Sequence, residues 1–122
     1  MDKTALEAII TQAKQAAAAA AQAYVDKWTA ETGGNQYGEP MYCGFAWTTI
    51  KQFNGKEIDG RTKIGRMFKA AGVEQGYAGR FELHNPGNWN GQSVEVKAAG
   101  ARAAAQVFES HGFTANATLQ GD

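Results

Sequence analysis

Apolar residues recur at intervals of three and four along the first thirty positions, which is the spacing of one helix face. The stripe consists of Leu6, Ile10, Ala13, Ala17, Ala20, Tyr24 and Trp28. Thr4 and Glu7 have the spacing of a capping box, and Gly33-Gly34 provide a stop. The pattern predicts a helix within residues 4–30, roughly 38 Å long. Because this exceeds a compact body of the chain's size, the helix either lies on a sheet or self-associates through its alanines.

Residues 41–50 form the longest β-like run, and their side chains alternate between two faces. The face that we predict to point into the core is large and apolar, and carries Met41, Cys43, Phe45, Trp47 and Thr49. The opposite face is small in its middle, and carries Tyr42, Gly44, Ala46, Thr48 and Ile50. We expect a helix, another backbone or a ligand to lie close to this small face. Pro40 favours an extended conformation at the preceding Glu39, which starts the strand.

The rest of the chain alternates between helical and extended patterns. Residues 52–60 are polar and rich in glycine, which indicates a loop. A second helix is predicted over 61–71, followed by a strand over 80–84 and a turn rich in Asn and Gly. The apolar face of this second helix consists of Ile64, Met67, Phe68 and Ala71.

A third helix begins at Gln92 or Ser93 and runs to about His111, unless residues 94–96 form a short strand and the helix begins near Lys97. A last strand begins at Phe113 and runs to about Leu119. The order α-β-α-β-α-β predicts an α+β fold, or a small α/β one, with helices on a sheet of three or four strands. Residues 1–34 would form the long helix and residues 35–122 a compact body, within a single domain.

Charge and composition narrow the function classes. Twelve Lys and Arg balance twelve Asp and Glu, which argues against nucleic acid as a partner. No apolar run approaches the roughly 20 residues that span a bilayer, which argues against a membrane role. The first residues lack the apolar segment of a signal peptide, so we expect a cytosolic protein. A single cysteine excludes an internal disulfide.

A local basic block lies between residues 51 and 80, with seven positive and three negative charges. Residues 55–62 come close to a phosphate-binding loop, but Arg61 stands where Lys belongs, and Glu57 and Asp59 would repel phosphates. We therefore do not predict phosphate hydrolysis. The start of the second helix either holds an anion through free N–H groups, Arg61, Lys63 and Arg66, or is a solvated cationic face.

The turn at residues 85–93 is the second candidate surface. Its hydrogen-bonding groups are Asn85, Asn88, Asn90, Gln92 and Ser93. They surround Trp89, which either folds back onto the core or stacks on a ligand or partner. Lys97 lies one helical turn beyond Ser93 and adds a positive charge.

No catalytic, metal or cofactor site is predicted. Cys43 is expected to be a buried core thiol. His84 and His111 stand apart from it in the sequence, and the three residues lack the spacing of metal ligands.

Four segments resemble a family of small uncharacterised proteins encoded by tailed bacteriophages. They are Tyr42-Cys43-Gly44-Phe45-Ala46-Trp47, Asn85-Pro86-Gly87, Gly91-Gln92-Ser93 and residues 97–112. The resemblance covers roughly residues 38–122. It implies a phage accessory protein in the cytoplasm of the bacterial host, of the kind that antagonises host defence by binding a host protein or a small nucleotide signal.

These observations favour a non-enzymatic binding protein. Its ligand would be a small anionic, nucleotide-like molecule or a host protein. The predicted contact residues are Tyr42, Trp47, Arg61, Lys63, Arg66, Asn85, Trp89, Asn90, Gln92, Ser93 and Lys97. The alternatives are a small hydrolase of a phosphorylated metabolite, and a structural or assembly protein that forms a homo-oligomer through residues 4–30.

Overall fold

The computed structural model describes residues 1–121, so Asp122, the last residue of the predicted body, lies outside the described residues. The helices are α1 (Lys3–Thr32), α2 (Lys63–Ala70) and α3 (Val94–Ser110), with a 3-10 turn η1 (Tyr77–Gly79). The strands are β1 (Gly44–Phe53), β2 (Lys56–Glu57), β3 (Glu74–Gln75), β4 (Phe81–His84) and β5 (Phe113–Gly121). This architecture confirms the predicted α+β fold with its long N-terminal helix. Within residues 1–121, no helix has both the length and the apolar character to cross a bilayer.

The five strands form one antiparallel sheet with β1 at its centre. Strand β5 pairs with one side of β1, whereas β4 and β2 pair with the other, and β3 lies outside β4. The short strands β2 and β3 were not predicted. Strand β2 returns from β1 through Asn54-Gly55, both with positive φ, so the predicted loop at residues 52–60 is in part a hairpin.

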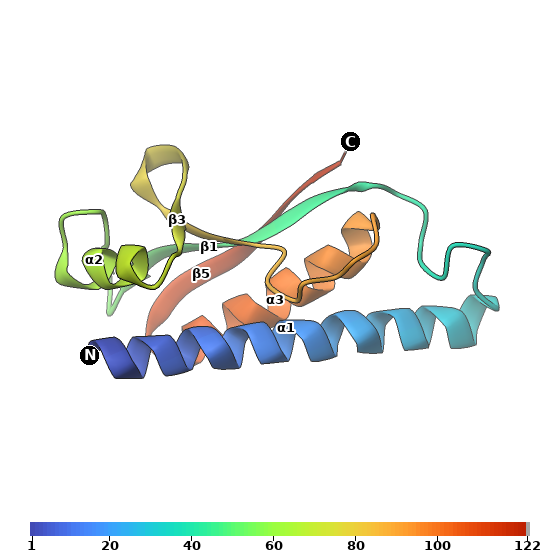
Figure 1. The fold of residues 1–122 in the computed structure, drawn as a ribbon, viewed down its shortest axis with the longest axis horizontal. Coiled ribbons are helices and arrows are strands. Elements are labelled where there is room, and N and C mark those ends of the chain that lie inside the picture. The colour runs from blue at the N-terminus through green and yellow to red at the C-terminus, as the bar shows by residue number, and fades with distance from the viewer. Residues whose placement is uncertain (122) are drawn as a thin grey trace.

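Helix α3 lies between the sheet and α1, which runs along the base of the molecule (Figure 1). The predicted alternatives for α1 were a sheet or a second copy, but its buried side instead packs mainly on α3. Close approach requires glycine: a Cβ on Gly100 would lie 3.1 Å from the carbonyl oxygen of Ala17, and one on Gly87 would lie 2.9 Å from it. The buried alanines of α1, which are Ala13, Ala17 and Ala21, therefore serve an internal helix contact.

The buried stripe of α1 departs from the predicted one after Ala17. Its members are Leu6, Ile9, Ile10, Ala13, Ala17, Ala21 and Val25. Tyr24 and Trp28 are only half-buried, because the helix contacts α3 and the turn before it rather than a flat sheet. The cap was also misplaced: the Asp2 carboxylate, not Thr4, accepts a hydrogen bond from the N–H of Ala5 at 2.8 Å.

The prediction of which face of β1 is buried was wrong. Ala46, Thr48 and Ile50 are at most 2% exposed, whereas Phe45 is 55% exposed. The small side chains are needed because α3 approaches closely, and the hydroxyl of Thr48 donates a hydrogen bond to the carbonyl of Ala101 on α3 at 2.8 Å. Met41 and Cys43 are exposed and Trp47 is half-buried, so the large side chains look away from the core, and only Thr49 of the predicted core face is buried.

An aromatic cluster closes the end of the core beneath α2. Phe68 is fully buried, and its ring centroid lies 5.1 Å from that of Phe81, 6.1 Å from Phe108 and 5.8 Å from Phe113. Helix α2 is shorter than predicted because Thr62 caps it by accepting the N–H of Gly65 at 3.0 Å. Helix α3 begins at Val94, which confirms the helical alternative for residues 94–96.

Candidate binding site at the start of helix α3

A buried carboxylate organises the region where the linker after α1 meets the start of α3. Oε1 of Glu39 accepts hydrogen bonds from the indole Nε1 of Trp89 at 2.8 Å and the backbone N of Ser93 at 3.1 Å. Its Oε2 accepts the backbone N of Gln92 at 3.0 Å. The start of a helix favours such a negative group, so Glu39 occupies the anion position that this helix end offers.

The local backbone leaves space for this carboxylate. A Cβ on Gly91 would fall within 2.4 Å of three Glu39 side-chain atoms, so a larger residue there would displace the carboxylate from this position. The segment before β1 also pairs with the start of α3, since Val94 donates to the carbonyl of Tyr42 at 2.8 Å and Gly44 to that of Gln92 at 3.1 Å. The linker and the helix start therefore form one connected unit.

Trp89 folds back onto the core, which is one of the two predicted alternatives. It packs against a cluster formed by Ala21, Val25 and Val96. Asn85 closes the turn: its amide donates to the carbonyl of Trp89 at 3.0 Å, and its Oδ1 accepts the N–H of Trp89 at 3.3 Å. These contacts hold the indole against α1 with its N–H aimed at Glu39.

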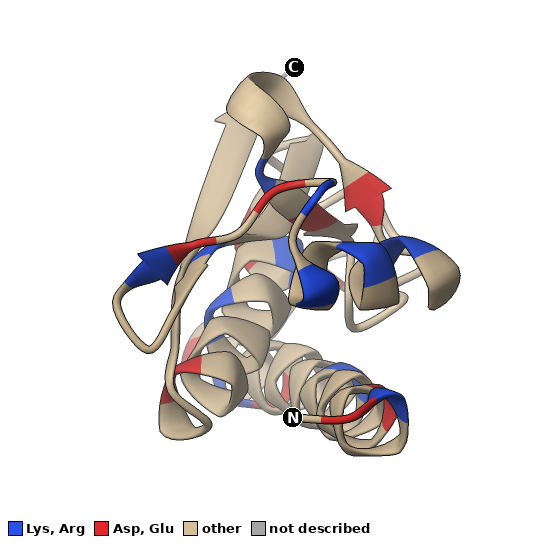
Figure 2. Ribbon diagram, turned by 90° about the vertical axis from the view of Figure 1, so that its left-hand side faces the viewer, with Lys and Arg blue, Asp and Glu red and all other residues tan. Residues whose placement is uncertain are grey.

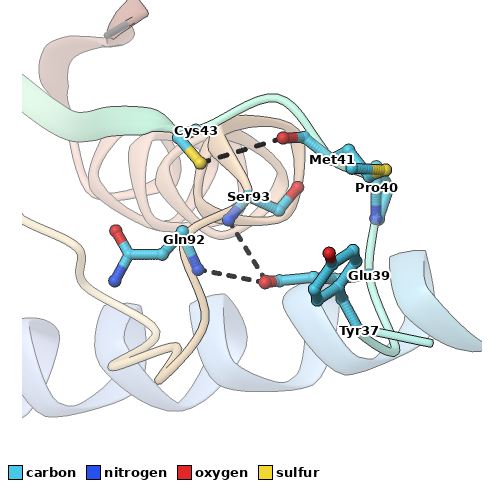
Figure 3. Close-up of a pocket in the computed structure, with 7 residues that line it drawn as sticks. All are labelled: Tyr37, Glu39, Pro40, Met41, Cys43, Gln92 and Ser93. Atoms are coloured by element: carbon cyan, nitrogen blue, oxygen red, sulfur yellow. Dashed lines mark hydrogen bonds between the residues drawn. The ribbon is translucent and has the colours of Figure 1, made fainter. Parts of the chain in front are cut away.

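A pocket of about 250 Å³ opens beside this carboxylate (Figure 3). Its lining residues are Tyr37, Glu39, Pro40, Met41, Cys43, Gln92 and Ser93. Figure 3 shows the Glu39 side chain reaching to the backbone of Gln92 and Ser93, with the aromatic ring of Tyr37 beside it. The pocket is therefore a mainly apolar hollow with its polar groups already bonded to one another.

Four large apolar side chains that line the pocket, or come shortly after its lining residues in the sequence, are exposed. They are Tyr37, Met41, Tyr42 and Phe45, which are 62%, 67%, 77% and 55% exposed, and we call them the 37–45 surface. Three other large apolar side chains are exposed in residues 1–121, namely Met1, Tyr77 and Leu119. Apolar exposure is thus concentrated in one nine-residue stretch, which is typical of a contact surface.

Cys43 was predicted to be a buried thiol, but the structure places it in the exposed wall of the pocket. Its Sγ lies 3.8 Å from the carbonyl oxygen of Met41. We expect a thiol-specific disulfide reagent to label the folded protein to one equivalent per chain, because the sulfur needs no unfolding to react. Labelling that waits for denaturant would contradict this exposure.

Lys97 is part of the scaffold in this structure. It is 9% exposed, its Nζ donates to the carbonyl of Gly44 at 3.0 Å, and it lies 5.6 Å from the ring centroid of Phe45. These contacts tie α3 to the first residue of β1. The exposed members of the predicted set at this end of the molecule are Tyr42, Asn90 and Gln92.

The predicted cations of the basic block lie at the other end of the molecule. Arg61, Lys63 and Arg66 are exposed on and before α2, on the side that faces the viewer in Figure 2. The carboxylate of Asp59 lies beside these cations. It accepts a hydrogen bond from the backbone N–H of Arg61 at 2.7 Å and lies 3.9 Å from the guanidinium of Arg61. The structure therefore does not bring these cations together with Trp89.

Trp47 lies apart from both of these regions, on the open face of the sheet. Its ring stacks on His84 with the centroids 5.3 Å apart. Nε2 of His84 lies 2.9 Å from Oε1 of Glu82 and 3.7 Å from Oε2 of Glu74. These residues are neighbours because β1, β4 and β3 pair side by side.

Sequence reasoning missed the centre of the site. Glu39 was considered only for the backbone effect of Pro40, and the lining residues Tyr37 and Met41 were not selected. One signal was available: an acidic residue next to a proline, in a linker otherwise free of charge from residue 33 to residue 50. Its partners lie in a turn fifty or more positions away, and no periodic pattern connects two irregular segments.

The site as a whole has the chemistry of recognition. Its donors are bonded to an internal carboxylate, and its exposed part is apolar. In residues 1–121, no group of three or more His, Cys, Asp or Glu side chains is placed to hold a metal ion. Comparison with protein-family models, curated proteins and solved structures finds no match to this chain.

Proposed function

We propose that the protein is a non-enzymatic binding protein that recognises another protein through the 37–45 surface and the pocket beside Glu39. The observation that carries this proposal is the run of exposed apolar side chains in one short stretch: Tyr37 and Met41 line the apolar hollow, and Tyr42 and Phe45 follow directly in the chain. Aromatic residues and Met are enriched where proteins contact each other, and a few anchors supply most of the binding energy. The segment that carries this surface is hydrogen-bonded to the start of α3, through the carbonyl of Tyr42 and the N–H of Gly44.

The size of the pocket favours a side chain over a free nucleotide. A volume of about 250 Å³ lies below the roughly 300–1,000 Å³ of small-molecule sites. It is large enough for one aromatic or aliphatic side chain from a partner. The N–H groups that would bind a phosphate are bonded to Glu39, and the cations of α2 lie at the other end of the molecule.

The partner that we propose is a protein of a bacterial host, with this chain acting as a phage accessory protein in the host cytoplasm. The support for this setting is the resemblance of residues 38–122 to small phage proteins. Antagonism of host defence is the role that such an accessory protein would have.

A capture experiment with matched variants tests the proposal. Immobilised wild-type protein is expected to retain one host protein in stoichiometric amount, and Met41→Ser with Tyr42→Ala is expected to lose it. Tyr77→Ala is the control, because Tyr77 is 92% exposed and lies on η1, away from the pocket. Equal capture by both variants would contradict the site, and a large thermal shift with a nucleotide would favour the small-ligand alternative.

A further inference from the structure

Strand β5 forms an open edge of the sheet. It pairs with β1 from Phe113 to Gly121, and no other strand within residues 1–121 pairs with it. Its nine residues contain neither a charged side chain nor proline. Such an edge presents a row of free backbone N–H and C=O groups to a further strand.

The other edges of the same sheet are built differently. Strands β2 and β3 contain two residues each, and they carry Lys56, Glu57 and Glu74. Short edge strands and charged side chains are the usual means of preventing edge-to-edge pairing. Strand β5 has neither protection over a length that suits a full strand pair.

The direction of the free groups follows from the bonds of β1. The N–H of Asn85, next to β4, donates to the carbonyl of Ala46 at 2.9 Å, so the polar backbone groups of Ala46 point away from β5. Alternation along the paired strands then assigns the groups of β5. Those directed at β1 belong to Asn116, Thr118 and Gln120. Those directed at the open edge belong to Ala115, Ala117 and Leu119.

One side chain already covers part of this edge. The amide of Asn116 donates to the carbonyl oxygen of Ala117 at 3.2 Å, as expected for a carbonyl without a strand partner. Leu119 is 48% exposed although it shares the inner face of β5 with the buried Ala115. Towards its C-terminal end, strand β5 therefore has both a backbone edge and an inner face that are incompletely covered.

We propose that β5 pairs with β5 of a second copy, antiparallel about a two-fold axis at Ala117, which joins two sheets into one. In this register Ala117 faces its own symmetry mate, and Ala115 faces the partner's Leu119. All three residues have outward backbone groups, so they form roughly six hydrogen bonds at two per pair. The pairing satisfies the free groups of both copies at once.

The side chains of β5 are self-complementary in the same register. On the open face of the sheet, Thr114 lies opposite the partner's Gln120, and Asn116 lies opposite the partner's Thr118. These are neutral hydrogen-bonding pairs, and no like charges meet. On the inner face, Leu119 packs over the partner's Ala115. A neutral, self-complementary edge fits a second copy better than a charged peptide.

The helix layer is compatible with this pairing. Helix α3 packs on β1 and β5, so its symmetry mate lies about two strand spacings away, roughly 10 Å, which is a normal helix packing distance. A groove of about 290 Å³ lies between β5, α3 and α1, where this mate would approach. Its lining residues are Tyr24, Val94, Glu95, Ala98, Arg102 and Leu119. It carries both charge signs, so the two copies can present opposite charges to each other.

Sedimentation of the full chain tests the pairing. We expect wild-type protein to be dimeric at high micromolar concentration. Thr114→Lys with Gln120→Lys places like charges opposite each other twice, and is expected to raise the dimer dissociation constant on the order of tenfold or more. Both residues are exposed, so the circular dichroism spectrum should stay unchanged. Thr114→Glu with Gln120→Glu should have the same effect.

Mixing the two doubly substituted proteins tests the register. Each is expected to be monomeric alone, whereas an equal mixture should form a heterodimer, because every lysine then faces a glutamate. The control is Ala19→Lys with Ala23→Lys on the exposed side of α1, which should leave the dimer intact. A monomeric wild type, a dimer that survives the lysine pair, or a dimer lost only in the α1 control would each overturn the proposal.

Discussion

Replacing Glu39 by alanine is expected to lower the free energy of unfolding by about 3–5 kcal/mol. The carboxylate is 9% exposed and accepts three hydrogen bonds, from Trp89, Gln92 and Ser93. Its removal leaves three donors in a poorly solvated place, and bonds to a charged acceptor are the stronger kind. Urea unfolding followed by circular dichroism measures the change.

Two further variants make this result specific. Glu39→Gln keeps one acceptor oxygen and nearly the same shape, so we expect about half of the loss. Glu31→Ala removes an exposed carboxylate near the end of α1 and should change stability by less than about 0.5 kcal/mol. If Glu39→Ala were as stable as Glu31→Ala, the carboxylate would not organise the site.

Ile50→Ala is expected to destabilise the fold by about 2–5 kcal/mol, whereas Phe45→Ala should cost about 1 kcal/mol or less. Ile50 is fully buried in the main core cluster, and Phe45 is 55% exposed on the opposite face of β1. The small loss at Phe45 reflects its contact with the ammonium group of Lys97. Chemical denaturation of the two single variants measures both changes.

The comparison tests which face of β1 is buried. Phe is the larger residue, so a ranking by side-chain size alone predicts the reverse order. A greater loss for Phe45→Ala than for Ile50→Ala would contradict the placement of α3 against the small face.

The helices were predictable because their signals are local. The periodic stripe through Ala17 predicted α1, and the third helix was predicted to run to about His111, close to its observed end at Ser110. The hairpin turn at Asn54-Gly55 also had a local signal, since this dipeptide favours positive φ at both positions. It was missed because the polar residues around it suggested a loop.

The orientation of β1 was not predictable from alternation alone. Alternation separates two faces but does not say which one is buried. The larger face looked like the core, yet α3 presents Ala98 and Ala101, and such a flat helix surface packs closely only on small residues such as Ala46. Which face of β1 is buried therefore depends on α3, whose residues come about fifty positions later in the chain.

The candidate site was predicted in part. Gln92 and Ser93 line the pocket, and Trp89 is hydrogen-bonded to the carboxylate of Glu39 beside it. The cations of α2 lie at the other end of the molecule (Figure 1). An anion was expected at the start of the second helix, whereas the structure shows a carboxylate of the chain itself, Glu39, at the start of α3. Its role depends on a contact between two irregular segments, which side-chain periodicity does not encode.

A calorimetric titration tests the proposed recognition surface most directly. The captured host protein is titrated with untreated chain and with chain whose Cys43 carries a bulky disulfide adduct that fills the pocket. A protein labelled at Cys43 should bind at least about tenfold more weakly, the effect of losing one main anchor. Equal affinity of the labelled and untreated proteins would contradict binding through the 37–45 surface.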